Sequence, residues 1–504
     1  MTVSCSLATV DYKGSSQCSA SVAGTGNYNS AITWTATGGS IDQSGAFTAS
    51  NSSSSATVTA TSQQDSTKSG TATLTLTTIS GVAVSCSFPS IGNNVVEQCS
   101  ATVTGTGNLD KSVTWSADNG SIDTNGNFTA PATGSSATIK ATSTMDTSKT
   151  GSATVALTNA SNAGAVFSVQ VTPDDSTLLL ASFDTCVFSG SCTAVSNGGL
   201  YTYSLSAPSA PEPMGHAYHI DSNALAEYYH LAYSSAAKTA FVVNADGYLQ
   251  AFDVADVSSP AFVSEVSVGA GNQALSVALS LDQKTAYVAD SSRVLSQFDV
   301  SAPLIMTLNS NAPIGSQAWS TVMSPDGQQL LLFNQGWIQA MDLSSGISAA
   351  TTDIGQNPVM LNAPNASAPG VQITPALATG TYIGDRTVVL VGPAGATLVD
   401  LTDPAKPVIQ GSVAFAGTPS VPGLIDYAAY YAQAKGVVYI VAGNNFYVLN
   451  VSNPANVSIV ASAALPANPY GSNAAGMPAS ISATSDGSNA YVVSAGQLTI
   501  LSIP

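Results

Sequence analysis

A tandem duplication constrains this chain more than any other feature: residues 1–160 repeat with an offset of 81 positions. A period without gaps indicates two copies of one structural unit. Runs such as residues 56–61, Ala-Thr-Val-Thr-Ala-Thr, alternate apolar and polar side chains, which is typical of half-buried strands. Short strands, Asx-Gly and Ser-Gly turns and one Trp per copy predict a small β-sandwich over 1–79 and another over 80–160. The landmark residues are Cys5, Cys18 and Trp34, which recur as Cys86, Cys99 and Trp115.

The motif order within each copy carries a family resemblance. Residues 31–36 (Ala-Ile-Thr-Trp-Thr-Ala), 38–42 (Gly-Gly-Ser-Ile-Asp) and 45–49 (Gly-Ala-Phe-Thr-Ala) return in the same order in the second copy. This order resembles that of bacterial Ig-like domains, which occur in tandem on secreted and surface proteins. Both cysteines precede the Trp, so the inter-sheet disulfide of antibody-type Ig domains does not apply.

The six cysteines form three local pairs: Cys5 with Cys18, Cys86 with Cys99, and Cys186 with Cys192. The first two pairs have the same spacing, and this duplication predicts disulfides, with buried free thiols as the alternative. Metal binding is disfavoured because the repeats contain no histidine. Disulfides require an oxidising compartment, so the expected location is extracellular or at the cell surface.

The low content of charged residues and the negative net charge limit the kinds of partner that the chain can bind. Only 8% of the residues are charged, against about 25% in an average soluble protein, and the net charge is −18. With 11 Lys and Arg against 29 Asp and Glu, binding to nucleic acid or to an anionic membrane surface is disfavoured. No apolar run approaches the roughly 18 residues of a membrane helix, so no membrane insertion is expected. No secretory signal is visible after Met1, which we interpret as a start residue placed on a mature chain.

A second repeat begins near residue 161. A strand with the pattern apolar–x–apolar–apolar–Asp–apolar recurs seven times at intervals of about 43 to 58 residues, each time preceded by a shorter apolar strand, as in propeller blades. The sequence therefore predicts an all-β protein in which two tandem Ig-like β-sandwiches precede a seven-bladed β-propeller over 161–504. The seven copies are residues 200–205, 249–254, 295–300, 338–343, 396–401, 446–451 and 498–503.

These copies resemble the YVTN and LVIVD repeats of bacterial surface propellers, most closely at residues 400–407 and 450–456. The resemblance covers 165–504 and implies the fold, with little about function. Because the chain ends on a third strand, we expect the segment near 153–165 to supply the fourth strand of the last blade, or that blade to stay three-stranded. The recurring Asp has the periodicity of a structural residue.

All three histidines, His216, His219 and His230, lie within residues 216–230, with Asp221 and Glu227 among them. Since His is the commonest metal ligand, the cluster is a candidate metal site. We expect His216 and His219 in the loop between the first two blades and His230 on an inner strand. The alternative is a solvated loop and a histidine that lines the channel.

Tyrosines mark the starts of two inner strands: Tyr228 and Tyr229, beside His230, and Tyr427 and Tyr430 at a matching position. Tyr and carboxylate side chains at a channel mouth are suited to binding a sugar ring, and packing between blades is the alternative. No nucleophile elbow, Cys/His dyad, phosphate loop or calcium loop is present, so the sequence predicts no catalytic residue and no cofactor. Paired carboxylates for glycoside hydrolysis stay open.

The favoured function is a secreted or cell-surface binding or adhesion protein, with an Ig-like stalk that presents the propeller to a glycan or an extracellular protein. One alternative is a propeller enzyme, lactonase-like or glycoside-hydrolase-like. Another is a structural subunit of an extracellular assembly, since surfaces with little charge tend to self-associate.

Overall fold

The computed structural model describes most of the chain as β-strands joined by turns. Two single-turn 3-10 helices, η2 (Gln433–Lys435) and η3 (Pro454–Asn456), are the helical elements among the described residues, which confirms the predicted all-β class. None of this part of the chain forms a helix long and apolar enough to cross a membrane. The described residues are 1–50, 53–107, 109–158, 165–184, 198–219, 227–334, 337–344, 346–347, 351–353, 379–393, 395–404, 406–415, 427–466 and 479–504.

The chain divides into two compact units. Unit 1 comprises Met1–Cys86, Gln98–Phe128 and Ser136–Val155, and unit 2 comprises Ser87–Glu97, Thr129–Ser135 and Ala156–Pro504. Unit 2 therefore contains short segments of the second repeat in addition to the C-terminal part. The domain boundaries at 79/80 and 160/161 stay a prediction.

The first repeat folds into two four-stranded sheets that share one core. Alternation along the strands directs Val58 inward and Thr57 and Thr59 outward, as the period of two requires. Trp34 lies in the core between the sheets, against Phe47 and Leu74 among others. One sheet is β1 (Thr2–Cys5), β3 (Ser15–Ser21), β6 (Ala46–Ala49) and β5 (Gly39–Ile41), and the other is β2 (Thr9–Val10), β8 (Ser69–Leu76), β7 (Ser55–Ser62) and β4 (Ile32–Thr37).

The second repeat keeps this strand pairing at the sequence offset. The parallel pair of Thr9 and Thr75 returns as Ser90 and Ala156. Unlike Trp34, Trp115 is only half-buried. Its strands are β9 (Thr78–Cys86), β10 (Ser90–Gly92), β11 (Val96–Thr106), β12 (Val113–Ala117), β13 (Ser121–Ile122), β14 (Asn127–Thr129), β15 (Ser136–Ser143) and β16 (Thr150–Thr158).

Both predicted disulfides of the repeats are confirmed: Cys5 is bonded to Cys18, and Cys86 to Cys99. In each case the two cysteines lie directly opposite one another on neighbouring antiparallel strands. The third predicted pair, Cys186 and Cys192, lies outside the described residues.

We expect the double substitution Cys5→Ala and Cys18→Ala to lower the free energy of unfolding of the first repeat by about 2–4 kcal/mol, because the cross-link restricts the unfolded chain. Differential scanning calorimetry measures this as a lower transition temperature. Ser4 and Ser19 are the next pair in register, exposed, with their hydroxyls 3.3 Å apart. Replacing both with Ala is the matched control and should change stability by less than about 0.5 kcal/mol. An equal effect of the two double substitutions would contradict the prediction.

In unit 2, seven sheets follow one another along the described chain, each an antiparallel meander. The recurring sequence pattern lies on the third strands and the shorter apolar runs on the second strands, as predicted. The first strands are β17 (Ala165–Val171), β21 (Tyr228–Ser234), β25 (Ala274–Leu279), β29 (Ser320–Met323), β33 (Thr379–Tyr382), β37 (Tyr427–Ala432) and β41 (Ser480–Ala483). The second strands are β18 (Thr177–Phe183), β22 (Thr239–Asn244), β26 (Thr285–Asp290), β30 (Gln329–Asn334), β34 (Thr387–Gly392), β38 (Val437–Ala442) and β42 (Asn489–Ser494).

The third and fourth strands complete the meanders. The third strands are β19 (Gly199–Ser204), β23 (Tyr248–Asp253), β27 (Val294–Asp299), β31 (Trp337–Asp342), β35 (Gly395–Asp400), β39 (Asn445–Asn450) and β43 (Gln497–Ser502). The first six sheets have fourth strands from the same part of the chain: β20 (Glu212–Ala217), β24 (Ala261–Ser267), β28 (Thr307–Pro313), β32 (Thr351–Asp353), β36 (Val408–Ala414) and β40 (Ser458–Ala464).

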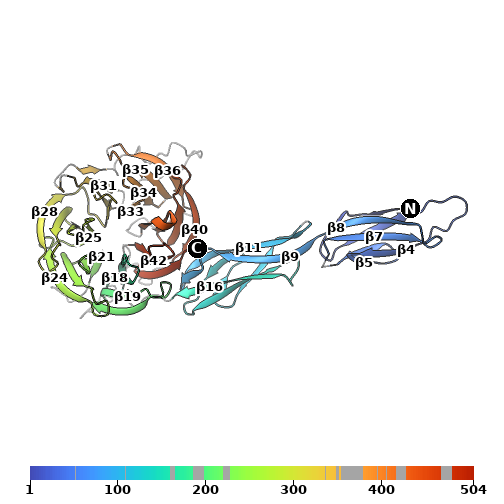
Figure 1. Ribbon diagram of the computed structural model, residues 1–504, viewed down its shortest axis with the longest axis horizontal. Coiled ribbons are helices and arrows are strands. Elements are labelled where there is room, and N and C mark those ends of the chain that lie inside the picture. Colours follow the sequence, from blue (N-terminus) through green and yellow to red (C-terminus); the bar gives the residue numbers. More distant parts are fainter. Residues whose placement is uncertain are drawn as a thin grey trace. The chain divides into compact units, whose positions relative to one another are not determined.

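The seven sheets close into a ring. Each first strand contacts the first strand of the next sheet, and β41 contacts β17. Within unit 2, β21, β25 and β33 lie toward a common centre, and β24, β28, β36 and β40 lie at the rim (Figure 1). An apolar cluster that includes Leu178 of the first sheet and Tyr491 of the last fills the closing interface. The N–H of Val171 also donates to Ser482 Oγ across it, at 2.9 Å.

The last sheet corrects the prediction for its fourth strand. β43 pairs with β10 through Ser502 and Ser90, so a strand of the second repeat takes the fourth position. The described residues of the segment 153–165, which are 153–158 and 165, do not take it, because β16 pairs with β10 and Ala165 begins β17. In the sixth sheet, Val96 pairs in the same way with Ala464. The alternating pattern marks where strands lie, and it contains no information on which distant segment covers a sheet edge.

The recurring Asp has the structural role that its period predicts. At the ends of third strands, Asp253 Oδ1 accepts the N–H of Ala255 and Asp400 Oδ1 accepts that of Thr402, both at 2.8 Å. Asn450 makes the same bond at 3.0 Å. These Asx turns reverse the chain between the third and fourth strands.

Candidate functional site

The candidate site lies at the end of the ring where the first strands begin. In an antiparallel meander, the start of the first strand and the end of the second strand meet at the same end of the sheet. Phe167 on β17, Phe183 at the end of β18 and Tyr229 on β21 therefore come together. Trp319 directly precedes β29. Its backbone N–H donates to the carbonyl oxygen of Phe333 at 3.0 Å, which fixes Trp319 at this end of the fourth sheet.

The four aromatic rings form a continuous group. Phe167 stacks on Phe183 with centroids 4.4 Å apart, and Phe183 lies 5.0 Å from Tyr229. Tyr229 and Trp319 are 5.6 Å apart with their planes at 89°. Phe167 and Phe183 are buried, whereas Tyr229 and Trp319 are half-buried. We call the perpendicular pair of Tyr229 and Trp319 the aromatic corner.

Carboxyl groups lie beside the aromatic corner. Glu227 forms a β-bridge with Phe183, and its carbonyl accepts the N–H of Ala245 at 3.0 Å. The next residues along those two strands, Asp184 and Asp246, are thereby brought close to it. Burial, and then the charges of Asp246 and Asp184, raise the pKa of the Glu227 carboxyl above its usual value. We call Asp184, Glu227 and Asp246 the acidic group.

Tyr228 and His230 flank Tyr229 in sequence and lie in different surroundings. Tyr228 is fully buried in the core between the first two sheets. Its hydroxyl accepts the N–H of His219 at 2.8 Å and lies 3.2 Å from the carbonyl of that residue. His230 has a buried Nδ1 that makes no hydrogen bond within the described part of the chain. Burial lowers the pKa of His230 to about 4, so its ring is neutral at pH 7.

Of the other two histidines, His216 lies on a strand and His219 lies in the loop that follows this strand, as predicted for His219. His216 lies on β20 and not in the predicted loop, because it stacks on its cross-strand partner Tyr201 at 4.1 Å. His219 stacks on Phe262 at 3.6 Å, with its Nε2 3.7 Å from Glu265. Among the described residues, no histidine belongs to a set of three candidate ligand atoms within 4.8 Å of one another. Asp221 lies outside the described residues.

The predicted ligand tyrosines of the sixth sheet mainly pack against neighbouring side chains. Tyr427 is the first residue of β37, as Tyr228 is of β21, and it packs against the cluster between the fifth and sixth sheets. Tyr430 stacks on Tyr439 with centroids 6.5 Å apart. Tyr229 is thus the one predicted ligand residue that joins the aromatic corner. Sequence reasoning missed Trp319, although its position immediately before a first strand was an available signal.

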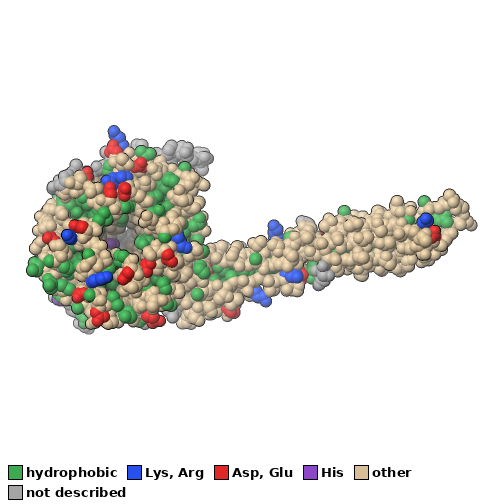
Figure 2. All heavy atoms as spheres, in the orientation of Figure 1, with side chains coloured by type: hydrophobic (Ala, Val, Ile, Leu, Met, Phe, Trp, Pro, Cys, Tyr) green, Lys and Arg blue, Asp and Glu red, His purple; other side chains and the backbone are tan. Residues whose placement is uncertain are grey.

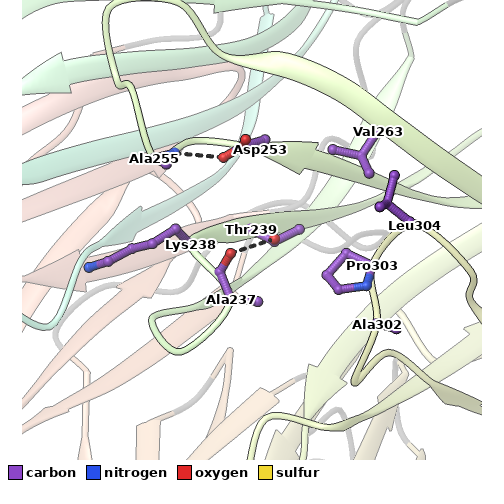
Figure 3. A pocket seen from close by; sticks show the side chains of 9 residues that line it. All are labelled: Ala237, Lys238, Thr239, Asp253, Ala255, Val263, Ala302, Pro303 and Leu304. Atoms are coloured by element: carbon purple, nitrogen blue, oxygen red, sulfur yellow. Dashed lines mark hydrogen bonds between the residues drawn. The ribbon is translucent and has the colours of Figure 1, made fainter.

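Away from the aromatic corner, a pocket with a volume of about 440 Å³ lies between the second and third sheets. Figure 3 shows Val263, Pro303 and Leu304 at one end of this pocket, and Lys238 extending from the other. Leu304 and the neighbouring Ile305 are 76% and 74% exposed. This pocket is mostly apolar, and its lining side chains are Ala237, Lys238, Thr239, Asp253, Ala255, Val263, Ala302, Pro303 and Leu304.

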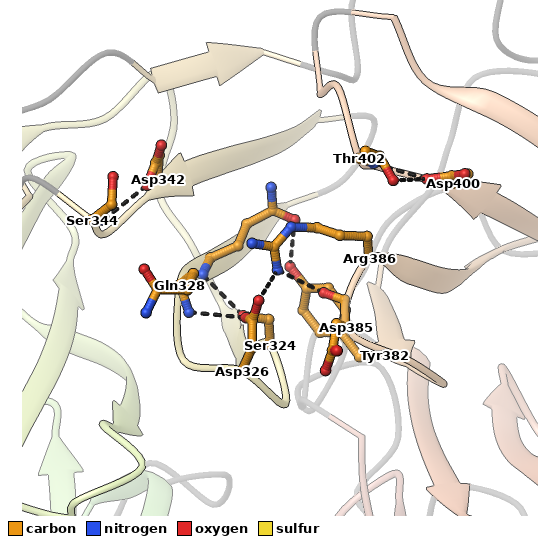
Figure 4. Close-up of polar contacts among 11 residues, drawn as sticks. Ser324, Asp326, Gln328, Asp342, Ser344, Tyr382, Asp385, Arg386, Asp400 and Thr402 are labelled. Atoms are coloured by element: carbon orange, nitrogen blue, oxygen red, sulfur yellow. Dashed lines mark hydrogen bonds and ion pairs between the residues drawn. The ribbon is translucent and has the colours of Figure 1, made fainter.

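A polar contact joins the fourth and fifth sheets at the turns after their first strands (Figure 4). Arg386 pairs with Asp326 at 2.7 Å, and the hydroxyl of Tyr382 donates to Gln329 at 2.8 Å. The guanidinium group lowers the pKa of Asp326 to about 2. Acidic and basic side chains surround the central hollow on the face of unit 2 in Figure 2. Arg386 and Asp326 form an ion pair, and Tyr382 and Gln329 form a hydrogen bond, so these four side chains have a structural role.

Comparison with protein-family models finds no match, and comparison with curated proteins finds none either. The fold defines an all-β protein of many antiparallel sheets, several of them four-stranded. The two disulfides among the described residues indicate an oxidising, extracellular setting.

Proposed function

We propose that this chain is a secreted or cell-surface binding protein. In this proposal, residues 1–160 are two bacterial Ig-like domains and the seven sheets of unit 2 are a seven-bladed β-propeller of the YVTN/LVIVD type. The repeated strand pairing at the sequence offset supports the first assignment. The cyclic contacts of the first strands support the second.

The ligand of the propeller is a carbohydrate, bound at the aromatic corner. The observation that carries this proposal is the half-exposed, perpendicular pair of Tyr229 and Trp319 beside the carboxyl group of Glu227. Sugar rings present apolar C–H faces to aromatic side chains and hydroxyls to carboxylates, so this combination suits a glycan. Ligand sites with a few polar groups beside apolar walls are the usual pattern in proteins.

We expect the full chain to retain one class of glycan on an array, and Trp319→Ala to weaken that binding by about tenfold or more, since a buried aromatic contact contributes over about 1 kcal/mol. Tyr28→Ala is the control, because Tyr28 is an exposed tyrosine of the first repeat. Calorimetry of each variant verifies that it is folded. Unchanged binding by folded Trp319→Ala, or equal loss in both variants, would contradict the proposal.

Glycoside hydrolysis is a second candidate function, favoured by the raised pKa of Glu227 next to two carboxylates. A carboxyl group with a raised pKa is suited to act as the general acid, with a second carboxylate as nucleophile or base. Release of new reducing ends from the bound glycan, abolished in Glu227→Gln, would support this function. Retention of the glycan without product would leave binding as the function.

A further inference from the structure

We infer that the glycan bound at the aromatic corner carries a protonated amine, as a sugar with a free amino group does. This inference rests on the proposed function. The acidic group, the scarcity of cations and the half-buried rings of Tyr229 and Trp319 support a positively charged ligand.

The acidic group is held in position by the backbone. The bridge between Phe183 and Glu227 and the bond from Ala245 N to Glu227 O join the ends of β18, β21 and β22. Asp184 Oδ1 also accepts the N–H of Gly198 at 3.0 Å, at the start of the third strand. Three carboxyl groups thus lie at adjoining strand ends beside Tyr229.

Positive charge is scarce in this part of the chain. The sequence contains no Lys or Arg between Lys149 and Lys238, which spans the whole first sheet and β21. Lys238 lies in the turn after β21, at the opposite end of that strand from Tyr229. Arg293 is in the turn between β26 and β27 of the third sheet, at the end of the ring where the site lies.

The three histidines of this region have contacts of their own. The Nε2 of His216 is 2.9 Å from the carbonyl of Gly198, and His219 lies beside Glu265. His230 is neutral at pH 7, because burial lowers its pKa. A ligand that brings its own positive charge therefore meets a site with an excess of carboxyl groups.

A protonated amine fits both components of the site. Over the faces of Trp319 or Tyr229 it is attracted by the ring quadrupole. Toward Glu227 it donates charge-assisted hydrogen bonds, which are stronger than those of a neutral hydroxyl. It also relieves the mutual repulsion of the carboxylates, which contributes to the raised pKa of Glu227. A neutral glycan gains the stacking and the weaker hydrogen bonds of its hydroxyls.

The test compares two oligosaccharides of equal length: an oligomer of glucosamine and its fully N-acetylated counterpart. Isothermal titration of the full chain at mildly acidic pH should give at least about tenfold tighter binding of the free amine form. High salt should reduce this preference, since ion pairs near the surface are screened. Glu227→Gln should abolish it, because the free amine form loses more affinity than the N-acetylated oligomer does.

Glu212→Gln is the matched control, because Glu212 is an exposed carboxylate on β20 and the net charge changes equally. It should keep the preference. If Glu227→Gln does not fold, Asp246→Asn replaces it. Equal affinity for both oligomers, weakened in Trp319→Ala, overturns the amine inference and leaves the carbohydrate proposal standing. Binding of neither oligomer also overturns the inference, and the glycan array then decides the carbohydrate proposal separately.

Discussion

Phe88→Ala is expected to lower the free energy of unfolding of unit 2 by about 3–5 kcal/mol, the usual cost of removing a buried phenylalanine ring. Phe88 is 1% exposed, and its ring centroid lies 6.1 Å from that of Phe446 on β39. It belongs to the segment Ser87–Glu97, which unit 2 takes from the second repeat. Calorimetry should show a lower temperature for the transition of unit 2.

The matched control for Phe88 is Leu7, its counterpart in the first repeat. Leu7 is 49% exposed, so Leu7→Ala should change stability by less than about 0.5 kcal/mol. Equal effects of the two substitutions would contradict the assignment of Ser87–Glu97 to the packed core of unit 2.

Glu97→Gln is expected to remove a pH dependence of the stability of unit 2. Glu97 is 1% exposed, and its Oε2 accepts the N–H of Phe88 at 2.8 Å. Its Oε1 makes no hydrogen bond among the described residues. Burial raises the pKa of Glu97 from 4.5 to about 7. In the first repeat the corresponding side chain is the neutral Ser16, whose hydroxyl accepts the N–H of Leu7 at 3.1 Å.

The direction of the effect follows from linkage. Because the pKa of Glu97 is higher in the folded state, the folded chain binds more protons between about pH 4.5 and pH 7. Stability is therefore greatest below that range and falls as pH rises through it, by on the order of 3 kcal/mol. Glu97→Gln should be more stable than the unmodified chain above about pH 7 and should lack this slope.

Urea unfolding at a series of pH values measures this slope. Glu212→Gln again serves as the control, because Glu212 is exposed and its substitution should leave the slope unchanged. If the stability of the unmodified chain rises across the same pH range, or if Glu97→Gln keeps its slope, the account of Glu97 is wrong.

Local patterns in the sequence predicted much of the fold. The offset of the duplication predicted both disulfides, because the same strand pair recurs with its cysteines opposed. The period of the recurring Asp predicted a structural role, and the structure shows this role as an Asx turn, which is a local interaction. The pairing of Ser90 with Ser502 joins residues far apart in the chain, and strand alternation contains no information about such partners.

The sequence predicted only part of the candidate site, because local patterns do not show which side chains meet in space. Successive side chains of a strand point to opposite faces, so Tyr228 and Tyr229 could not share one environment. A β-bulge lies between Tyr228 and His230. The sequence does not reveal this bulge, and so it does not reveal whether Tyr228 or Tyr229 enters the core. Trp319 of the fourth sheet meets Tyr229 of the second sheet only through the closed arrangement of the sheets, which no local pattern shows.

A crystal structure of the full chain with the glycan that binds it most tightly would show directly whether the aromatic corner is the binding site. We expect a sugar ring in contact with Tyr229 and Trp319, with a polar group of the ligand within hydrogen-bond distance of Glu227. A ligand in the pocket beside Val263 and Leu304, with the aromatic corner empty, would contradict it.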